Sequence, residues 1–317
     1  MAGPMIPIEE YAQRREHAAK LVAEAGYDVL VGNGTESDAS VVRYFSAYWP
    51  LFEMGGVAIA PDARSALMVG MESAEFAKER GVIDNIHLMK EYRETADPEY
   101  PGVAGVSYRE VFESIGVTDP GRIGVAGWLC TNMGMYEGLR EAFPEAEIVN
   151  ADELTATLRA RKSPAELACL REGFRLGELA LEAMLKAVRP GMTELELAGV
   201  AIAELYANGA EGEAHTVYSF GGTKTTNAIS RSTHRPLEVG DIVQIDVGGR
   251  VDGYSPSVGR PICLGQMSER QRRLIEFCRE MHYRTFDWVQ AGVVAKEVAI
   301  RYEQFVKDAG MERHYLY

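Results

Sequence analysis

The pattern of the sequence changes near residue 150, and this change divides the chain into two parts. In the first part, helix-forming segments alternate with short apolar runs that are typical of buried strands. We expect strands over 27–31, 57–60, 66–69, 123–126 and 148–149. We expect helices over 8–25, 72–80, 107–115 and 132–142. Strands that alternate with helices predict an α/β domain over residues 1–152.

Three capping boxes mark helix starts in the second part. In each, a Ser or Thr and a Glu or Gln three residues later bond one another's backbone N–H groups. The pairs are Ser163 with Glu166, Thr193 with Glu196, and Ser268 with Gln271. Strand-like segments over 215–220, 241–247 and 253–264 lie between the second pair and the third. Helices first and hairpin-spaced strands after them predict an α+β domain over residues 153–317.

The charge of the chain excludes one class of partner. Lys and Arg number 33 and Asp and Glu number 47, which gives a net charge of −14. Such a chain repels phosphate backbones, so we expect no nucleic-acid partner. A basic protein partner is compatible with this charge.

The sequence also carries no signal for a membrane or for secretion. No apolar run approaches the roughly 18 residues of a membrane-spanning helix, so we expect no membrane partner. The N-terminal segment lacks an apolar core of the length that a signal peptide needs. The four cysteines include no CxxC pair, and we expect them to be reduced thiols of the core. These features predict a cytoplasmic protein.

The segment from Gly240 to Arg260 is the richest in residues with special chemistry. It contains an apolar run, two glycines at 248 and 249, and a returning segment. Asp246 lies at the end of the apolar run, where a carboxylate is costly unless it is hydrogen-bonded, paired or bound to a metal. Asp246 therefore either caps the turn through the amides of Gly248 and Gly249 or belongs to a functional site.

This segment resembles the core motif of the pita-bread-fold hydrolases, the family of Xaa-Pro aminopeptidase (aminopeptidase P), prolidase, methionine aminopeptidase and creatinase. The matching residues are Gly240, Asp241, Asp246, Gly248, Gly253, Tyr254 and Arg260. Segments 42–48, 159–166, 189–194 and 235–237 resemble further family motifs in the same order, with Ala47 where glycine is usual. The resemblance implies a creatinase-like N-terminal α/β domain followed by an α+β pita-bread domain.

The resemblance also implies an activity. Family members hydrolyse a C–N bond in a small-molecule, short-peptide or amidine-type substrate, and they are usually homodimers. The metal-dependent members hold two divalent ions, of the Mn, Co or Zn type, with two Asp, one His and two Glu. Asp246 matches the first Asp, but Ser257 stands where the second is expected.

The other three ligands of the family lie beyond the position that matches Tyr317. Residues 311–317 have the alternation of a strand start, so the domain looks incomplete. A hard divalent cation needs several oxygen or nitrogen ligands in fixed geometry. We therefore expect the dinuclear metal site to be missing, with Asp246 as the metal ligand only if a metal binds at all.

The resemblance to creatinase implies a chemistry without metal that uses a histidine base. In this chain the family's histidine position falls near Ile229, so His215 and His234 are the alternatives. We predict His215 and Asp246 as catalytic residues. General-base catalysis contributes about 10²–10⁴-fold to a rate.

Further side chains are predicted to bind the substrate. In the second domain these are Tyr254, Ser257, Arg260 and His234, and we expect Arg260 to pair with Asp246 across the hairpin. In the first domain, Tyr44 and Trp49 belong either to the core or to a substrate-lining surface. The alternative for the whole chain is a non-catalytic pita-bread domain that binds peptides or proteins.

Overall fold

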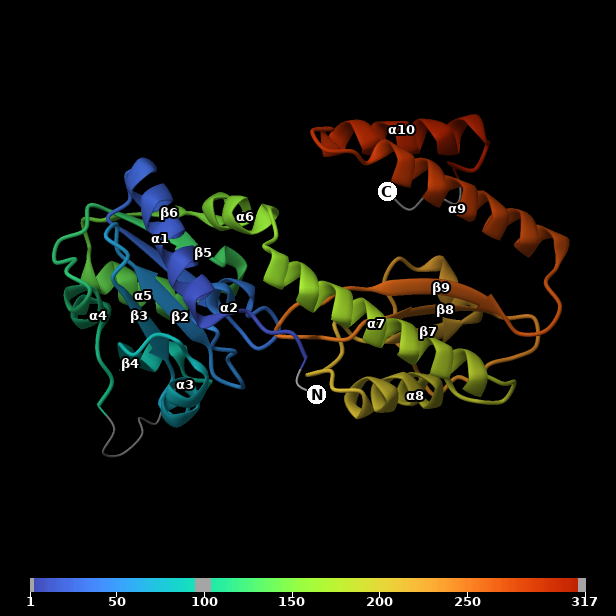
Figure 1. The fold of residues 1–317 in the computed structure, drawn as a ribbon, viewed down its shortest axis with the longest axis horizontal. Coiled ribbons are helices and arrows are strands. Elements are labelled where there is room, and N and C mark those ends of the chain that lie inside the picture. Colours follow the sequence, from blue (N-terminus) through green and yellow to red (C-terminus); the bar gives the residue numbers. More distant parts are fainter. Residues whose placement is uncertain (1–2, 95–103, 313–317) are drawn as a thin grey trace. The chain divides into compact units, whose positions relative to one another are not determined.

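The computed structural model describes residues 3–94 and 104–312, which form two compact units (Figure 1). Pro4–Cys169 makes up the first, here called the N-terminal unit. The second, the C-terminal unit, begins at Leu170 and includes Gly3. The long helix α7 (Pro164–Ala187) starts in the first unit and continues in the second.

The division between the units therefore falls after Cys169, later than the predicted boundary at 152. Contacts of the first turn of α7 explain this shift. The Ser163 hydroxyl donates to Glu10 at 2.9 Å, and Arg14 lies 3.5 Å from Glu166. These bonds join the start of α7 to the first helix of the chain.

A six-stranded mixed sheet forms the centre of the N-terminal unit. Its strands are β1 (Val29–Gly34), β2 (Gly55–Ile59), β3 (Ser65–Val69), β4 (Ile86–Leu88), β5 (Arg122–Ala126) and β6 (Glu147–Asn150). Their order across the sheet is β4-β3-β2-β1-β5-β6. The pairs β1–β2 and β2–β3 are antiparallel, and the other three pairs are parallel.

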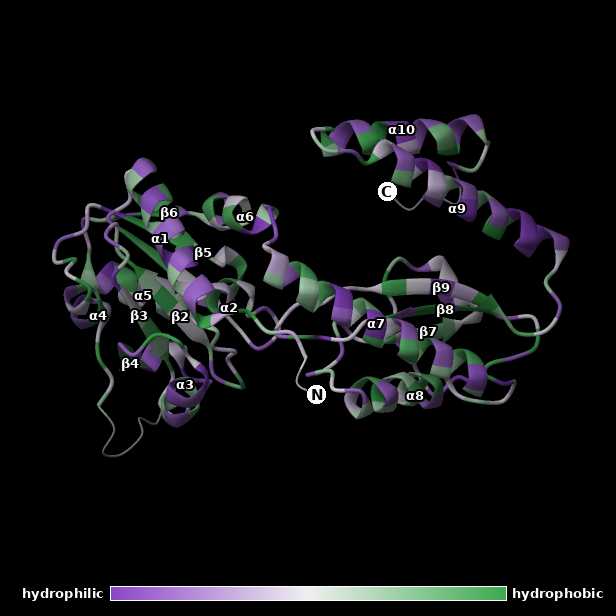
Figure 2. Ribbon diagram, in the orientation of Figure 1, coloured by the Kyte–Doolittle hydropathy of each residue, from purple (hydrophilic) through white to green (hydrophobic). Residues whose placement is uncertain are grey.

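Helices cover both faces of this sheet. They are α1 (Ile8–Glu24), α2 (Ser40–Ser46), α3 (Ala74–Arg80), α4 (Tyr108–Ser114), α5 (Met133–Ala142) and α6 (Asp152–Ala160). Alternate residues of β1 face opposite cores, as a strand requires. Leu30 packs with α1, α2 and α3, whereas Val29 and Val31 pack with α4 and α5. Figure 2 shows the resulting apolar strands between helices of mixed polarity.

The fold class predicted for this half is confirmed, with three omissions. The expected strands and helices are all present with small shifts of their ends. The sequence reasoning missed α2, β4 and α6. Two short 3-10 helices, η1 (Lys90–Tyr92) and η2 (Trp128–Cys130), complete the described part of the unit.

An antiparallel sheet of β7 (Tyr218–Gly221), β8 (Ile242–Val247) and β9 (Val258–Cys263) forms the C-terminal unit with its helices. These helices are α7, α8 (Glu194–Ala207), η3 (Gly222–Thr226), α9 (Glu269–Trp288) and α10 (Ala295–Asp308). Glycines let α7 approach the end of β8 closely. A Cβ atom at Gly173 would lie 2.6 Å from the carbonyl oxygen of Gly249.

All three predicted capping boxes form, at Ser163, Thr193 and Ser268. The α+β class predicted for this half is confirmed. The strand expected over 311–317 falls almost wholly outside the described residues. Among the described helices, none combines the length and hydropathy needed to cross a membrane. The four cysteines are free thiols, but only Cys169 among them is buried, which corrects the expectation of four core thiols.

A partly buried ion pair holds the segment that leads into β8. The Arg235 guanidinium donates to both carboxylate oxygens of Asp241, at 2.7 and 3.1 Å, and the backbone N–H of Glu238 adds a bond of 2.9 Å. Burial alone raises the pKa of Asp241, but these donors outweigh it and hold the pKa below its ordinary value. The pair fixes where the chain enters the sheet.

We expect Asp241→Asn to lower the free energy of unfolding at neutral pH by about 2 kcal/mol, because Arg235 loses a bidentate charged acceptor. A lowered folded-state pKa stabilises above the unfolded pKa and stops doing so as the pH falls through the folded value. The difference between wild type and variant should therefore shrink below about pH 4. Urea unfolding at several pH values measures it.

The exposed Asp287 supplies the matched control, since Asp287→Asn removes a charge without touching this pair. An Asp241→Asn penalty that stays constant down to the lowest pH at which the protein folds would contradict this account.

Candidate functional site

Strand register places Asp246 at the centre of the three-stranded sheet. Asp246 lies opposite Tyr218 of β7 on one side and Gly259 of β9 on the other. In β8 the side chains of Val243, Ile245 and Val247 are buried, so Asp246 belongs to the other face of the strand. The apolar alternation that aligns the strand thereby directs this carboxylate away from the core.

Two predicted site residues meet Asp246. The Ser257 hydroxyl donates to Asp246 Oδ1 at 2.5 Å, and His215 Nε2 lies 3.6 Å from the same oxygen. The ring of Tyr218 packs edge-on against His215, with 5.6 Å between centroids. We call Asp246, His215 and Ser257 the Asp246 cluster. Its members come from three separate segments of the C-terminal unit, and the Asp246 side chain is 28% exposed.

The hydrogen bonds of His215 define what each ring nitrogen can do. Nδ1 lies 2.8 Å from the carbonyl oxygen of Thr216, which can only accept, so Nδ1 carries a proton. Nε2 is shut off from solvent and faces Asp246. This arrangement favours a histidine that acts on Asp246, because Nε2 has no open path to a substrate.

The pKa shifts of His215 and Asp246 agree with their close approach. The Asp246 carboxylate raises the pKa of His215, because it favours the protonated ring more than burial opposes it. Burial raises the pKa of Asp246, but the neighbouring His215 imidazole and the hydrogen bond from Ser257 bring that pKa below its ordinary value. Asp246 is therefore a carboxylate that stays ionised at neutral pH.

Among the described residues, those that contact Asp246 are a serine hydroxyl and an imidazole, whereas the two-ion site implied by the resemblance needs a second Asp and further carboxylates. Asp246 Oδ1 already accepts from Ser257, and a hydroxyl that donates to a carboxylate does not add a negative ligand charge. Within residues 3–94 and 104–312, no three His, Cys, Asp or Glu side chains come together in a way that could hold a metal ion. No chemical step is therefore derived through a metal.

Arg260 does not contact the partner that the sequence predicted for it. It lies opposite Ile245 in the β8–β9 ladder, and Ile245 and Asp246 point to opposite faces. The Arg260 guanidinium donates to the carbonyl oxygen of Gly259 at 2.6 Å. The predicted pair between Arg260 and Asp246 is therefore wrong, because the register places Gly259, and not Arg260, opposite Asp246.

The other residues predicted to bind the substrate make none of the contacts described for the Asp246 cluster. Tyr254 forms the β8–β9 turn, where its backbone exchanges hydrogen bonds with Val251. His234 is exposed in the connection between η3 and β8. Tyr44 and Trp49 belong to the N-terminal unit, where Arg14 packs over the ring of Tyr44 at 4.2 Å and Arg43 over that of Trp49 at 5.0 Å. These arginine contacts favour a structural role for both aromatic side chains.

Sequence reasoning missed a buried carboxylate next to this site. Glu194, at the start of α8, is completely buried. Its Oε1 accepts from the backbone of Gly221, and its Oε2 accepts from Lys224 Nζ at 2.5 Å and from the backbone and hydroxyl of Thr233. The four donors outweigh burial and lower its pKa. A Glu inside a predicted capping segment gave no signal of this role.

Glu194 ties both ends of the β7–β8 connection to one helix start. Gly221 ends β7, Lys224 lies in η3, and Thr233 precedes the entry to β8. The hydroxyl of Ser219, in β7, donates to the backbone oxygen of Glu194 at 2.6 Å. The network therefore holds β7 in place beside β8, and this pairing brings Tyr218 and Asp246 together.

Two family matches cover nearly the whole chain. Residues 14–161 match the creatinase/prolidase N-terminal domain, and residues 168–316 match metallopeptidase family M24. These ranges correspond to the two units, apart from short segments at their ends.

Similar proteins agree with these matches. An Xaa-Pro dipeptidase of Pyrococcus furiosus is 24% identical over 276 residues, which cover 87% of this chain and 73% of that protein. A creatinase of a Bacillus species is 25% identical over 195 residues, which cover 59% of this chain and 47% of that protein. The chain thus spans between about half and three quarters of the length of these curated relatives.

The solved structures show the same fold. A dipeptidase of Mycobacterium ulcerans is 20% identical and superposes with a TM-score of 0.79, covering 99% of this chain and 80% of that one. An Xaa-Pro dipeptidase of Bacillus anthracis, also 20% identical, has a TM-score of 0.76 and covers 94% and 78%. Together with the two domain matches, these likenesses show that the chain belongs to the pita-bread family of Xaa-Pro peptidases and creatinases.

Proposed function

We propose that this protein hydrolyses a C–N bond in a small peptide or amidine-type substrate, with the Asp246 cluster as its reacting centre and without a dinuclear metal site. One observation carries the proposal. In the unit that matches metallopeptidase family M24, Ser257 and His215 converge on one oxygen of an ionised, partly exposed carboxylate. The free thiols are compatible with the cytoplasm as its location.

The geometry gives each member of the cluster a role. Ser257 and His215 occupy Oδ1 of Asp246, and their two contacts leave Oδ2 for a ligand. Asp246 Oδ2 accepts a proton from the attacking water, whose oxygen bonds to the substrate carbon. The C–N bond then breaks, and the nitrogen leaves with that proton. His215 and Ser257 are positioning residues, because each acts through Asp246.

A substrate with N–H donors suits this site. The carboxylate is ionised, so it attracts the ammonium group of a short peptide or an amidinium group. These are the two substrate types that the Xaa-Pro dipeptidase and creatinase relatives suggest by their names.

The test uses the full-length product of the gene, assayed against Xaa-Pro dipeptides and guanidino and amidino compounds. We expect turnover that survives a chelator and falls about 10²–10⁴-fold in Asp246→Asn, which keeps the shape but removes the base. Ser257→Ala should cost about tenfold, since one hydrogen bond to a charged group is lost. Asp287→Asn is the control.

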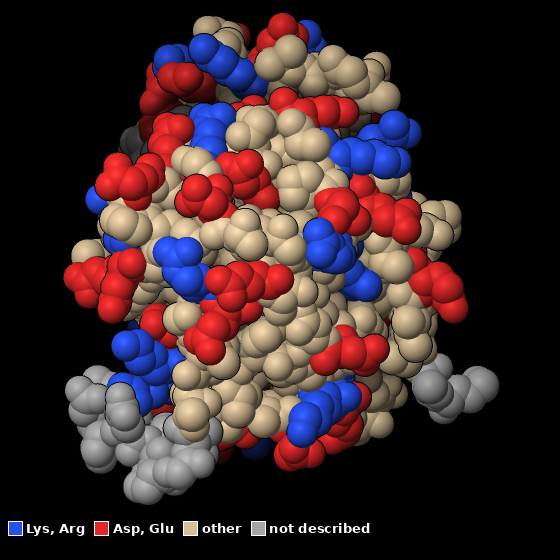
Figure 3. Space-filling view, turned by 90° about the vertical axis from the view of Figure 1, so that its left-hand side faces the viewer, with Lys and Arg blue, Asp and Glu red and all other residues tan. Residues whose placement is uncertain are grey.

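Activity that a chelator abolishes and added metal restores would overturn the metal-free site. If no compound of either class is hydrolysed while basic peptides bind in a salt-sensitive way, the alternative of a non-catalytic peptide-binding domain is favoured. The net charge of −14 motivates that alternative. On the face shown in Figure 3, however, acidic and basic side chains are interspersed.

A homodimer is also part of the proposal, and an apolar patch of the N-terminal unit supports it. Two segments contribute, joined by a hydrogen bond from Asn132 Nδ2 to Met54 Sδ at 3.3 Å. Their exposed side chains are Leu51, Phe52, Trp128, Leu129 and Met133, with Leu129 98% exposed and Phe52 75% exposed. Exposed apolar side chains on adjoining segments are typical of interaction sites in soluble proteins.

We expect Leu129→Asp to convert a dimer into a monomer, because a charge in the centre of an apolar interface loses its hydration. Light scattering coupled to size-exclusion chromatography reads out the mass. Leu195→Asp is a matched control, since Leu195 is exposed in the first turn of α8, where an acidic side chain is well tolerated. A dimer that persists in Leu129→Asp would exclude this patch as the interface.

A further inference from the structure

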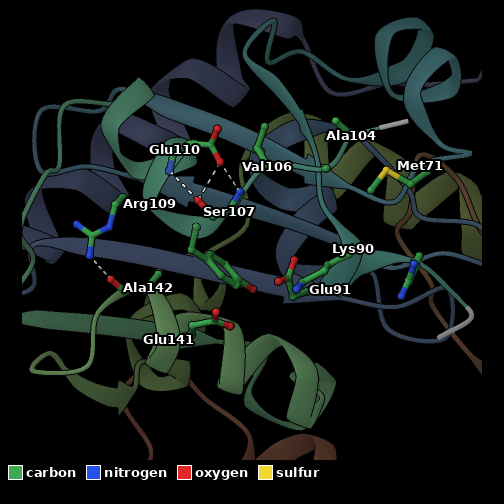
Figure 4. A pocket seen from close by; sticks show the side chains of 14 residues that line it. Met71, Lys90, Glu91, Ala104, Val106, Ser107, Arg109, Glu110, Glu141 and Ala142 are labelled. Carbon is green, nitrogen blue, oxygen red and sulfur yellow. Dashed lines mark hydrogen bonds between the residues drawn. The ribbon is translucent and has the colours of Figure 1, made fainter. Parts of the chain in front are cut away.

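A cavity of about 530 Å³ lies in the N-terminal unit, and no part of the Asp246 cluster contributes to it. Its described lining comes from η1, the segment before α4, the start of α4 and the end of α5. Figure 4 shows Glu91 and Glu141 reaching into it from different elements. The volume is in the range of pockets that bind small organic molecules.

One acceptor atom of this cavity lacks a hydrogen-bond donor. Oε2 of Glu91 is closed to bulk solvent and has no hydrogen-bond partner among the described residues. Leaving a buried acceptor unsatisfied costs free energy, and the cost is larger for a charged group. Burial accordingly raises the pKa of Glu91, and the nearby Glu141 adds to this effect.

The nearby phenolic hydroxyls and the Arg109 guanidinium already donate hydrogen bonds to other acceptors. The Tyr108 hydroxyl donates to Tyr92, and the Tyr92 hydroxyl donates to Asn33 at 2.8 Å, so each phenolic hydrogen has an acceptor. The Arg109 guanidinium donates to the carbonyl oxygen of Ala142 (Figure 4). It also packs over the ring of Phe143. Glu91 therefore needs a donor from outside this set.

The backbone beneath Glu91 makes room for its carboxylate. A Cβ atom at Gly138 of α5 would lie 3.0 Å from Glu91 Oε1 and 3.1 Å from Tyr108 Cε2. Glycine inside a helix costs helix stability relative to alanine. Here its effect is to let the carboxylate lie directly against α5, on the same helix as Glu141.

The charges around the cavity indicate the class of ligand. Glu91 and Glu141 supply two carboxylates, while Lys90 and Arg93 add positive charge beside them. Glu110 is engaged in the capping box with Ser107. The described residues contain no metal-ligating group of three, and the cavity is much larger than an ion. A ligand with several N–H donors satisfies this geometry.

We propose that this cavity binds a small organic cation, whose guanidinium or ammonium group donates hydrogen bonds to Glu91 and Glu141. A carboxylate on the same ligand would meet Lys90 and Arg93, so a free basic amino acid fits both sets of charges. This site is independent of the proposed hydrolase activity, and its test requires no turnover.

Calorimetric titration of the full-length protein with three probes tests the proposal. L-Arginine should bind at least about tenfold more tightly than L-citrulline, which has nearly the same shape but a neutral urea group. Agmatine carries the guanidinium group without the carboxylate. Agmatine that binds like arginine assigns recognition to Glu91 and Glu141 alone, and weaker binding adds Lys90 and Arg93; both outcomes support the proposal.

Two variants probe the carboxylate itself. Glu91→Gln should weaken arginine binding about tenfold or more, since a charge-assisted bond becomes a neutral one. It should also raise the melting temperature without ligand, because an unpaired buried charge is removed. Gly138→Ala should weaken binding by displacing Glu91 while helix propensity favours the folded state. Glu137→Gln, at an exposed position of α5 outside the cavity lining, is the matched control.

The proposal is overturned if arginine and citrulline bind equally, or if neither binds. It is also overturned if Glu91→Gln and Glu137→Gln both bind arginine as the wild type does.

Discussion

The buried carboxylate of Glu194 is the constraint on which the C-terminal sheet depends. A charge with no exposure is stable only when donors surround it. Glu194 gathers them from the end of β7, from η3 and from the segment before β8. Because these segments flank one connection, satisfying the charge also fixes β7 against β8. The position of Asp246 opposite Tyr218 follows from that pairing.

The acidic side chains of this protein differ in how completely they are satisfied, and this difference separates structure from function. Glu194 has four donors, and Asp241 has a bidentate arginine. Oδ1 of Asp246 has two polar side-chain neighbours, and Glu91 Oε2 has no hydrogen-bond partner among the described residues. Glu194 and Asp241, with several donors each, hold the fold, whereas Asp246 and Glu91 carry the two proposed sites.

Local signals in the sequence predicted most of the fold but little of the site's geometry. Capping boxes and apolar alternation depend on near neighbours, so the helix starts and β8 were predictable. The side of the hairpin that Arg260 faces depends on the register, which places Arg260 opposite Ile245 and away from Asp246. The buried role of Glu194 depends on Thr233, which is 39 residues away, and no local pattern reports such a contact.

Ser257 makes the proposed metal-free site self-consistent. Two carboxylates at positions 246 and 257 would repel one another at close range unless a cation lay between them. A hydroxyl at 257 removes that repulsion and instead donates to Asp246 Oδ1. His215 adds a second favourable neighbour at the same oxygen. Asp246 thus remains ionised without a metal, so the serine alters what stabilises the charge while leaving the carboxylate in place.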